Sequence, residues 1–539
     1  MKIDPVQFGE KNPLMRDYRS HFEKVENKFD YHPFEEKSWS SRLEELKNRS
    51  FKREELSEVL KKMNEAYGAG PSTLAHIERL KEDHATVMIA GQQAGLLTGP
   101  LYTVNKVISV IEAAKQKEKS LGVPVLPVFW IAGEDHDFDE INHVYLNRDG
   151  LKKQKVAQTT DGKTSVSNVE LDKDAMVDFV EECFRQLPES SHTRRVYEYI
   201  NEAFEESRTY TDFFARLLVS LFGEQGLIVM DAHAPAIRNM ESDYFIQMIE
   251  HNKAISSGVY TKEQENRRQG YPVSLETEPE DAHLFYHNNN QRVLLMRQGK
   301  GFVGKQGELE ISEEELLMVA EETPEKLSNN VVSRPLMQDL LLPCLGFIGG
   351  PGEITYWSVL GPAFSELSIK MPPVLPRLSF TFINEEKRLK AKREGLDLYE
   401  VVRYGLGEEK MNYLASQTTI PMEELNKEAK EEISRLHSPF REEAEKISPD
   451  VKAYADKNLE YIEALIDDMG ERISKEKQKR YQKTLEFYTE LEELLRPKGG
   501  LQERIWNPLP FLNEYGWHFF TEIPEYNWDF RQQHYFIYN

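Results

Sequence analysis

MIAGQQAGLLTGPLYTVNK, residues 88–106, joins an apolar run to a helical pattern through two glycines and a Thr-Gly-Pro. We expect a buried strand, a tight turn and a helix, with Thr98 or Gly99 as the N-cap and Pro100 in the first helical turn. A helix start beside small residues is a candidate anion site. A tight connection without a ligand is the alternative, since the stretch matches neither standard glycine-rich phosphate motif.

The same kind of apolar run recurs along the chain at 125–132, 226–235 and 345–364, and the last two lead into helical patterns. Continuous apolar character is typical of strands that are buried on both faces. Such strands alternating with amphipathic helices predict an α/β protein with a Rossmann-like parallel sheet core and helices on both sides.

Other segments interrupt or flank this core, and one insertion carries the alternating pattern of a hairpin with an Asn-rich turn. The predicted division is an N-terminal helical cap at 1–84, core parts at 85–145, 223–255 and 331–384, insertions at 146–222 and 256–330, a helical coiled-coil domain at 385–500, and an aromatic tail at 501–539 that packs back on the core or the coiled coil.

Apolar residues at steps of three and four from Leu459 to Leu495 form a heptad-like seam that is interrupted near Glu476 and Arg480. This pattern favours an antiparallel helical hairpin or a dimerising coiled coil. A single long helix packed on its own domain is the alternative.

Composition limits the classes of function. The 539 residues carry a formal net charge of −24, which disfavours nucleic acid as a partner. No apolar run reaches the roughly 18 residues of a membrane span, and the N-terminus lacks the pattern of a signal peptide. With only Cys183 and Cys344, a Cys-rich zinc site is excluded, no metal site is predicted, and a cytoplasmic location is expected.

Polar residues follow the predicted strands at three places. WIAGEDHDFDEINH, residues 130–143, supplies candidates to bind an amine or sugar or to act as acid and base, with a solvated acidic loop as the alternative. Arg334 and Gln338 precede a second glycine turn, GGPGE, where an internal salt bridge of the arginine is the alternative to a bound anion. PKGGLQERIWNP, at 497–508, is a candidate nucleotide site or, alternatively, an aromatic docking surface.

MIAGQQAGLLTGPLYTVNK, LPVFWIAGEDHDFDEINH and SRPLMQDLLLPCLGFIGGPGEITYW resemble the bacillithiol-synthesis cysteine ligase family over the whole chain. The resemblance implies two insertions like the connecting peptides of class I aminoacyl-tRNA synthetases and a homodimer through the coiled coil. It also implies that cysteine is joined to glucosaminyl malate with ATP. The H-x-G-H of the synthetases is replaced by Tyr102, Thr103, Val104 and Asn105, and PRLSF, with Arg377 and Ser379, stands nearest to their K-M-S-K-S.

On this basis we assign expected roles to the candidates. The predicted catalytic residues are Asn105, Asp135, His136 and Asp137; the predicted substrate-binding residues are Gly91, Gln92, Gln93, Thr98, Gly99, Tyr102, Trp130, Glu134, His143, Arg334, Gln338, Gly350, Glu353, Arg377 and Ser379; and a second, nucleotide-binding site would use Lys498, Gln502, Arg504 and Trp506.

The expected ligands are ATP, or ADP as bound product, with Mg²⁺ as a possible companion and no structural zinc. Two other functions remain open at this point. One is a nucleotidyltransferase that acts on another small metabolite, and the other is a non-catalytic, nucleotide-binding dimeric scaffold.

Overall fold

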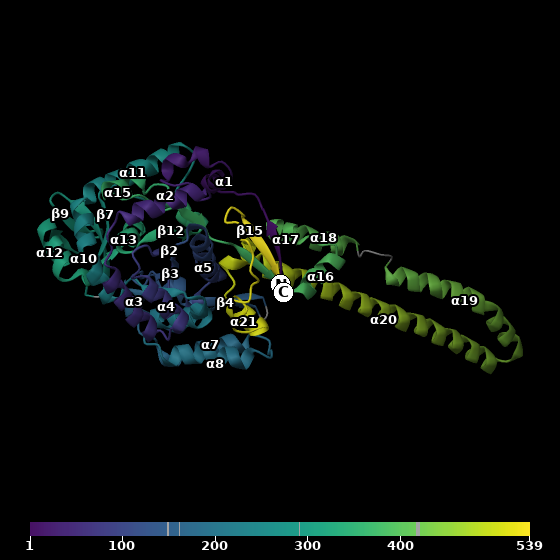
Figure 1. Cartoon of the computed structure of the whole chain (residues 1–539). Helices are drawn as coiled ribbons and strands as arrows, with labels where there is room; N and C mark the ends of the chain where they lie inside the picture. The colour runs from purple at the N-terminus through teal and green to yellow at the C-terminus, as the bar shows by residue number, and fades with distance from the viewer. Residues whose placement is uncertain (148–149, 161, 290, 417–420) are drawn as a thin grey trace. The chain divides into compact units, whose positions relative to one another are not determined.

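The computed structural model describes residues 1–147, 150–160, 162–289, 291–416 and 421–539. The chain forms two compact units, one made of Met1–Glu385 with Leu501–Asn539 and the other of Glu386–Gly500. Figure 1 shows both, coloured along the chain. Within the described ranges, no helix has the length and apolar character needed to span a membrane.

A five-stranded sheet forms the centre of the first unit, and every neighbouring pair in it is parallel. The predicted Rossmann-like fold class is therefore confirmed. The order is β13 (Val374–Pro376), β12 (Cys344–Gly349), β2 (Thr86–Gln92), β3 (Val125–Ile131) and β6 (Ile228–Asp231). Each of the four apolar runs identified in the sequence supplies one of these strands.

Helices cover both faces of this sheet because alternate side chains of a strand point to opposite faces. Val128 and Trp130 belong to one large apolar cluster with residues of the helices near the N-terminus. Phe129 points the other way and contacts Phe214 of α9, with 6.1 Å between ring centroids. The covering helices include α1 (Pro13–Ser20), α2 (Glu36–Lys47), α3 (Arg53–Ala66), α4 (Pro71–Arg79), α5 (Leu101–Leu121), α9 (Tyr210–Phe222), α10 (Pro235–Glu250), α11 (Asn252–Arg268), α13 (Ser333–Leu341), α14 (Pro351–Trp357) and α15 (Gly361–Glu366).

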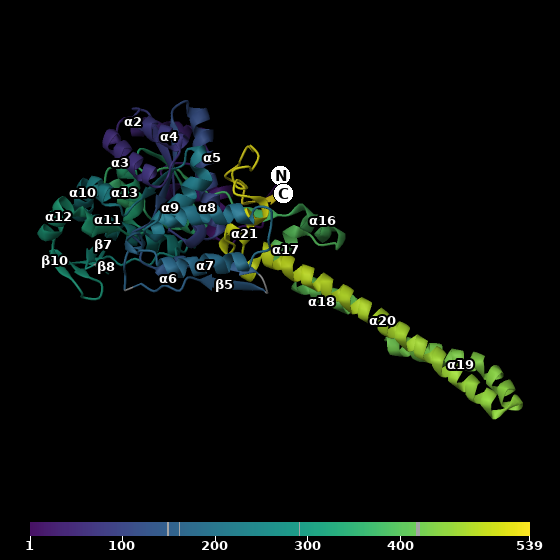
Figure 2. The same cartoon turned by 90° about the horizontal axis from the view of Figure 1, so that it is seen from below.

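The stretches between core strands carry their own small structures. The first holds α6 (Phe138–Ile141), the antiparallel pair β4 (His143–Asn147) and β5 (Leu151–Lys155), α7 (Lys173–Arg185) and α8 (Thr193–Glu205). Figure 2 shows these helices from below. The second holds an antiparallel sheet, β10 (Glu310–Ser312), β9 (Gly301–Gly304), β8 (Gln291–Gln298), β7 (Asp281–Asn288) and β11 (Leu327–Asn329), with α12 (Glu313–Glu322). The predicted hairpin is β7–β8; Asn290 in its turn lies outside the described residues.

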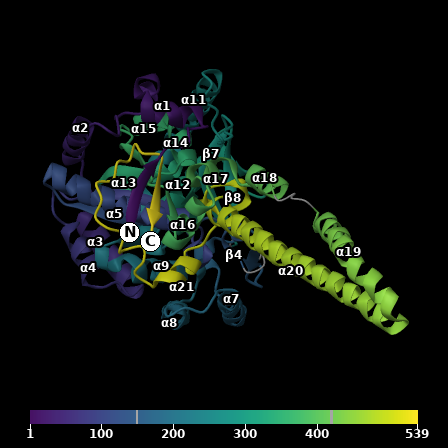
Figure 3. The same ribbon diagram turned by 90° about the vertical axis from the view of Figure 1, so that its right-hand side faces the viewer.

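The two chain termini meet in one small sheet of the first unit. Strand β1 (Lys2–Val6) pairs antiparallel with β15 (His534–Tyr538), which pairs in turn with β14 (Phe380–Ile383). Figure 3 shows the N- and C-terminal ends side by side. The prediction that 1–84 is helical throughout is wrong at its start, because β1 is completed by a strand more than 500 residues away that no local pattern indicates.

The turn at the opening stretch also differs from its prediction. Pro100, rather than Thr98 or Gly99, is the N-cap of α5, and it has no side chain that caps the helix. Leu97 and Thr98 adopt positive φ angles of 49° and 71°, a conformation that local sequence rarely indicates for such residues. The backbone N–H of Leu101 donates to Trp506 O at 2.8 Å, so the tail takes up a donor at this helix start.

The second unit is helical. It contains α16, which begins at the unit boundary (Glu385–Arg393), α17 (Leu398–Tyr404), α18 (Gly407–Ser416), α19 (Met422–Ile447) and α20 (Pro449–Leu495). Lys430 in α19 pairs with Asp467 in α20, and His437 contacts Asn458 at 3.1 Å, so the two helices run antiparallel (Figures 1 and 2). A helical hairpin is present, but it turns at Ser448, before the seam from which it was predicted. The interruption near Glu476 and Arg480 is no turn, because α20 continues through it, so the seam lies on a single long helix.

Candidate functional site

A polar cavity of about 390 Å³ opens beside the carboxyl ends of the central strands, where open parallel sheets bind ligands. The strand ends, α5, α13 and the β12–α14 connection supply most of its wall, and the tail adds one arginine. The lining residues are Gly91, Gln92, Gln93, Tyr102, Lys106, Trp130, Ala132, Asp135, Val331, Arg334, Pro335, Gln338, Phe347, Gly350, Pro351, Gly352, Glu353, Tyr356, Arg377 and Arg504.

Lys106 and Glu353 join the two sides of the cavity. The Lys106 Nζ lies 2.6 Å from Glu353 Oε2 and donates to Gly91 O at 2.7 Å. Burial lowers the pKa of Lys106, although Glu353 opposes this effect. Glu353 also accepts from the Gly350 backbone N–H at 2.7 Å, in the capping position expected for GGPGE. This pair therefore fixes the first strand end against the second glycine turn.

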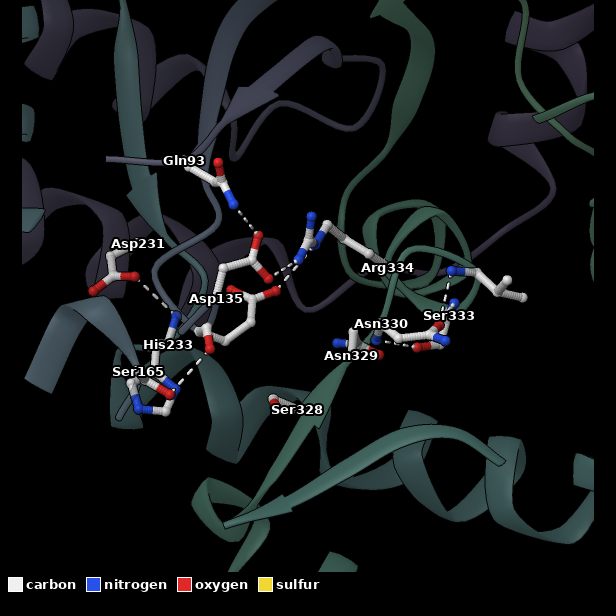
Figure 4. Close-up of polar contacts among 12 residues, drawn as sticks. Gln93, Asp135, Ser165, Asp231, His233, Ser328, Asn329, Asn330, Ser333 and Arg334 are labelled. Carbon is white, nitrogen blue, oxygen red and sulfur yellow. Dashed lines mark hydrogen bonds and ion pairs between the residues drawn. The ribbon is translucent and has the colours of Figure 1, made fainter. Parts of the chain in front are cut away.

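Arg334 reaches two adjacent carboxylates. Its Nε donates to Glu134 Oε1 at 3.0 Å, and its Nη2 donates to Asp135 Oδ1 at 2.8 Å (Figure 4). Burial alone would raise the pKa of Asp135, but Arg334 and Arg292 outweigh burial and hold that pKa below its ordinary value. Asp135 is therefore ionised at neutral pH, and Arg334 forms the internal salt bridge that the sequence left as an alternative.

Arg377 forms a forked pair with a residue of the tail. Its Nη1 and Nη2 donate to the two carboxylate oxygens of Glu503 at 2.7 and 2.6 Å. Asn105 Nδ2 donates to the same carboxylate at 2.6 Å. Both Arg377 and Glu503 are buried, so the tail holds this guanidinium in the cavity wall.

Arg504 differs from the other cations of the cavity. Its side chain is exposed, and among the described residues no carboxylate forms an ion pair with it. Lys106, Arg334 and Arg377 are each bound to a carboxylate of the chain. Arg504 is thus the cavity cation that remains available to an anionic ligand.

Of the predicted catalytic and substrate-binding residues, the structure brings together eleven in this cavity, namely Gly91, Gln92, Gln93, Tyr102, Trp130, Asp135, Arg334, Gln338, Gly350, Glu353 and Arg377. The others do not line it. Thr98 and Gly99 are buried in the strained turn, Asn105 is bound to Glu503, Glu134 is buried behind Arg334, and Ser379 contacts His534 at 2.7 Å.

The predicted acid–base residues near Asp135 also lie away from the cavity wall. His136 Nδ1 is 3.4 Å from Arg292 Nη1, and its pKa is lowered by burial and by that arginine. Asp137 is exposed at the start of α6, and His143 lies in β4. A charged residue next to Asp135 in sequence thus need not face the same space.

The residues predicted for a second nucleotide site belong to two different units of the chain. Gln502 is buried and exchanges hydrogen bonds with the backbone of Phe382, at 2.8 and 3.0 Å. Trp506 is buried, and Arg504 lines the main cavity. Lys498 belongs to the other compact unit.

Sequence reasoning missed Lys106, Tyr356 and Glu503. The helical spacing of Tyr102 and Lys106, one turn apart on α5, is the signal that places Lys106 on the same side as a predicted residue. Nothing local indicates Glu503, because its partner Arg377 is 126 residues away. Within the described part of the chain, no group of three or more His, Cys, Asp or Glu side chains is arranged to hold a metal ion.

A parallel α/β sheet with a polar cavity at its carboxyl edge defines a Rossmann-like protein that acts on small molecules. Two family models match: "Bacillithiol biosynthesis BshC, N-terminal Rossmann-like domain" over residues 1–378, and "Bacillithiol biosynthesis BshC, C-terminal coiled-coil domain" over 380–539. The chain belongs to this BshC family.

Relatives match along the full chain. A protein of Oceanobacillus iheyensis is 39% identical, with all of both chains covered, and one of Bacillus cytotoxicus is 40% identical, with 97% of each covered. A third, from a Geobacillus species, is 37% identical over all of both chains. Each is named "Putative cysteine ligase BshC", so the family is one of ligase enzymes of bacillithiol biosynthesis.

Proposed function

We propose that this chain joins L-cysteine to the amine of glucosaminyl malate, forming an amide in an ATP-dependent last step of bacillithiol biosynthesis. The name of its relatives supports the cysteine ligase activity. The observation that carries the proposal is the cavity itself, in which the unpaired Arg504 and the ionised Asp135 offer opposite charges. A substrate that carries carboxylates and an amine matches both charges, since its carboxylates suit Arg504 and its amine suits Asp135.

The reaction needs an activated acyl group, because a free carboxylate is a poor acyl donor. The cysteine carboxylate takes a phosphoryl or adenylyl group from ATP. The amine nitrogen then attacks the carbonyl carbon, the C–N bond forms, and the C–O bond to phosphate or AMP breaks while the amine loses a proton. Positioning of the reactants and stabilisation of developing charge are the contributions expected of the protein.

The residues of the cavity divide these tasks. Arg504 binds an anionic group, either a malate carboxylate or a phosphate, and Arg334 and Arg377 add positive potential although carboxylates neutralise them. Asp135 binds the amine through Oδ2, because its ion pairs with Arg334 and Arg292 use Oδ1 and Oδ2 accepts from Gln93 Nε2 at 3.4 Å. Because the pKa of Asp135 is lowered, this carboxylate is a weak base, and it suits binding of the amine better than removal of its proton.

A resident magnesium ion does not suit this donor set. The carboxylates that line the cavity, Asp135 and Glu353, are both in ion pairs with cations of the chain. Any Mg²⁺ would therefore enter with the phosphates of ATP, as part of the substrate.

We also propose that the second unit forms a homodimer. Among its exposed side chains, Leu436 and Phe440 of α19 are four residues apart, and Tyr454, Tyr461 and Leu465 of α20 follow steps of seven and four. Such spacing places each set on one side of its helix. Apolar stripes of this kind are typical of a helix–helix interface, and light scattering of Phe440→Glu and Tyr461→Glu variants would reveal a monomer if the stripes hold a dimer together.

The enzyme assay separates this function from its alternatives. Purified chain is incubated with cysteine, glucosaminyl malate and ATP, each omitted in turn, and the amide, ADP and AMP are measured. Amide that requires all three supports the proposal, and the nucleotide released identifies the activated intermediate. Nucleotide turnover without cysteine would instead favour a nucleotidyltransferase, and cells lacking the chain should accumulate glucosaminyl malate.

A further inference from the structure

The carboxylate of Asp135 is held in part from outside the Rossmann-like core. Its Oδ1 accepts from two guanidinium groups, Arg334 Nη2 at 2.8 Å and Arg292 Nη1 at 3.1 Å. Its Oδ2 accepts from Gln93, another residue of the cavity wall (Figure 4). Arg334 belongs to α13 of the core, whereas Arg292 belongs to β8 of the second insertion and lies outside the cavity wall. An effect of Arg292 on a ligand would therefore pass through Asp135.

The second insertion fixes the guanidinium of Arg292 in one orientation. Its Nε donates to Ser328 Oγ at 3.2 Å and its Nη2 to Asn329 O at 2.6 Å, both in β11. The guanidinium also lies over the Phe285 ring of β7, with 3.8 Å between the guanidinium carbon and the ring centroid. Arg292 is 3% exposed. Because a guanidinium is planar and rigid, these contacts determine where Nη1 points, which is toward Asp135.

The first insertion binds the backbone of the turn that carries Asp135. Each carbonyl oxygen of residues 133–135 accepts a hydrogen bond from residues 165–167, at 2.9 to 3.0 Å. A Cβ at Gly133 would overlap Ser167 Oγ, so this close approach requires glycine. The peptide units of the turn therefore have fixed directions, and the Asp135 side chain starts from a fixed point.

The two insertions are also joined to each other beside this turn. The backbone N–H of Arg292 donates to Lys163 O at 3.0 Å, and the backbone N–H of Lys163 donates to Gln291 Oε1 at 2.7 Å. Residues 163–167 of the first insertion thus contact both the turn and the strand that carries Arg292. A common segment therefore holds Asp135 and Arg292 in position relative to each other.

The charge of Arg292 matters as well as its position. Arg334 is shared between Glu134 and Asp135, at 3.0 and 2.8 Å, whereas among the described residues Arg292 forms its ion pair with Asp135 alone. Burial would raise the pKa of Asp135, and Arg334 and Arg292 lower it. Without Arg292, Asp135 would share one cation with Glu134, and its negative charge would be less stable.

We propose that Arg292 is a positioning residue for the amine substrate: together with Arg334 it engages Asp135 Oδ1, and so it directs Oδ2 to the amine. The inference rests on the proposed function, in which that amine belongs to glucosaminyl malate. Arg292 touches no substrate, and its effect reaches the ligand through Asp135. The second insertion thereby completes an amine site that the core alone does not build.

Binding of ligands with and without the amine tests this role. Isothermal titration of the full chain compares glucosaminyl malate with the analogue that has a hydroxyl group in place of the amine. The wild type should bind the amine compound about 10-fold more tightly or better, because an ammonium adds the attraction of opposite charges to the hydrogen bond. Arg292→Gln should bind the two compounds with nearly equal affinity. A wild-type preference for the amine in Arg292→Gln would overturn the proposal.

The same strand offers a matched control. Arg297 of β8 is partly buried, and its Nη1 pairs with Glu313 of α12 at 2.7 Å. Arg297→Gln therefore breaks an ion pair of the second insertion without reaching Asp135, and it should keep the preference for the amine. If Arg297→Gln lost this preference as fully as Arg292→Gln, the effect would come from general loosening of the insertion, and the proposal would be overturned.

A conservative variant covers the case in which Arg292→Gln does not fold. Arg292→Lys keeps the positive charge but lacks the forked guanidinium, so its preference for the amine should lie between those of the wild type and Arg292→Gln. Thermal unfolding shows which variants are folded. If Arg292→Lys is the folded variant of the two, a full wild-type preference in it would overturn the proposal.

Steady-state kinetics separate this inference from the proposed function. Arg292→Gln should raise the KM for glucosaminyl malate about 10-fold or more, with the KM for cysteine unchanged. If amide forms and Arg292→Gln keeps the wild-type KM for glucosaminyl malate, the positioning role is wrong and the reaction stands. If no amide forms, yet the wild type prefers the amine compound and Arg292→Gln loses that preference, the reaction is wrong and the positioning role stands.

Discussion

Two strand-to-helix connections of the core are both rich in glycine and proline, but only the second lines the cavity. Between β2 and α5 the chain reads GLLTGP, and from the last residue of β12 into the first turn of α14 it reads GGPGE. Residues 94–101 of the first do not line the cavity, whereas Gly350 through Glu353 of the second all do. Glycine and proline in a tight turn thus do not determine whether the backbone faces a ligand.

The tail explains the difference. Asn507 Nδ2 donates to the carbonyl oxygens of Leu97 and Gly99, at 2.9 and 2.8 Å, and the Trp506 carbonyl accepts from Leu101. The first connection is therefore bound by another part of the same chain. The second is capped by its own Glu353, and Gly350 through Glu353 line the cavity.

Removal of the tail's carboxylate should have the largest effect on this arrangement. Glu503→Ala would leave the buried Arg377 without its forked partner and Asn105 without its acceptor. We expect a loss of about 3–5 kcal/mol in the free energy of unfolding, measured by urea denaturation. Glu198→Ala, which breaks the exposed pair with Arg194, should leave stability nearly unchanged. If Glu503→Ala and Glu198→Ala unfolded at the same urea concentration, this account would be contradicted.

Arg504 tests whether the tail also contributes to ligand binding. Arg504→Ala should raise the KM for the anionic substrate about 10-fold or more, because a charge-assisted hydrogen bond contributes about 1.5–3 kcal/mol. Arg504→Lys should give a KM between those of the wild type and Arg504→Ala, since lysine keeps the positive charge but lacks the forked guanidinium. Thermal unfolding should not change, because the side chain is exposed. Unchanged kinetics in both variants would show that the cavity binds its anion elsewhere.

Asn507 tests the closure of the first connection. Asn507→Ala removes the donor that binds its carbonyl oxygens, and we expect a loss of about 2 kcal/mol in the free energy of unfolding. Asn513→Ala, which removes a buried tail amide bound to Pro188 O, is the matched control. Hydrogen exchange at Leu97–Leu101 should accelerate only in Asn507→Ala. Faster exchange there in both variants would point to general loosening of the tail.

The sequence was sufficient to predict four strands of the central sheet, but not its edge strand β13 or the sheet of the termini. Continuous apolar runs such as 125–131 indicate buried strands by themselves, and their alternation with helices predicts parallel pairing. Strand β1 has no such signal, because its five residues include a proline and pair with β15 at the far end of the chain. The positive φ of Leu97 and Thr98 was equally invisible, since distant contacts from Asn507 hold that turn.

The site was predictable where it depends on strand ends and unpredictable where it depends on distant pairing. The places of Gly91, Asp135 and Glu353 in the cavity follow from their positions at or just after the carboxyl ends of strands. The ion pair that holds Arg377 in the cavity wall could not be predicted in this way, because its partner, Glu503, lies in the distant tail. His136 was predicted to be catalytic because it follows Asp135 in sequence. Its ring instead contacts Arg292, away from the cavity wall.

Alanine at one glycine of each connection gives the smallest and most direct test of the contrast. Gly99 has a φ of 73° and a ψ of −157°, a region essentially confined to glycine, while a Cβ there would meet only ordinary contacts at 3.6 and 3.7 Å, so backbone conformation alone should cost about 1–3 kcal/mol. Gly352 lines the cavity, and a methyl group added there would meet only open space. Gly352→Ala should therefore leave stability within about 0.5 kcal/mol and raise the KM a few-fold by narrowing the cavity. Equal destabilisation by Gly99→Ala and Gly352→Ala, with equal kinetics, would mean that the two connections do not differ in the way described.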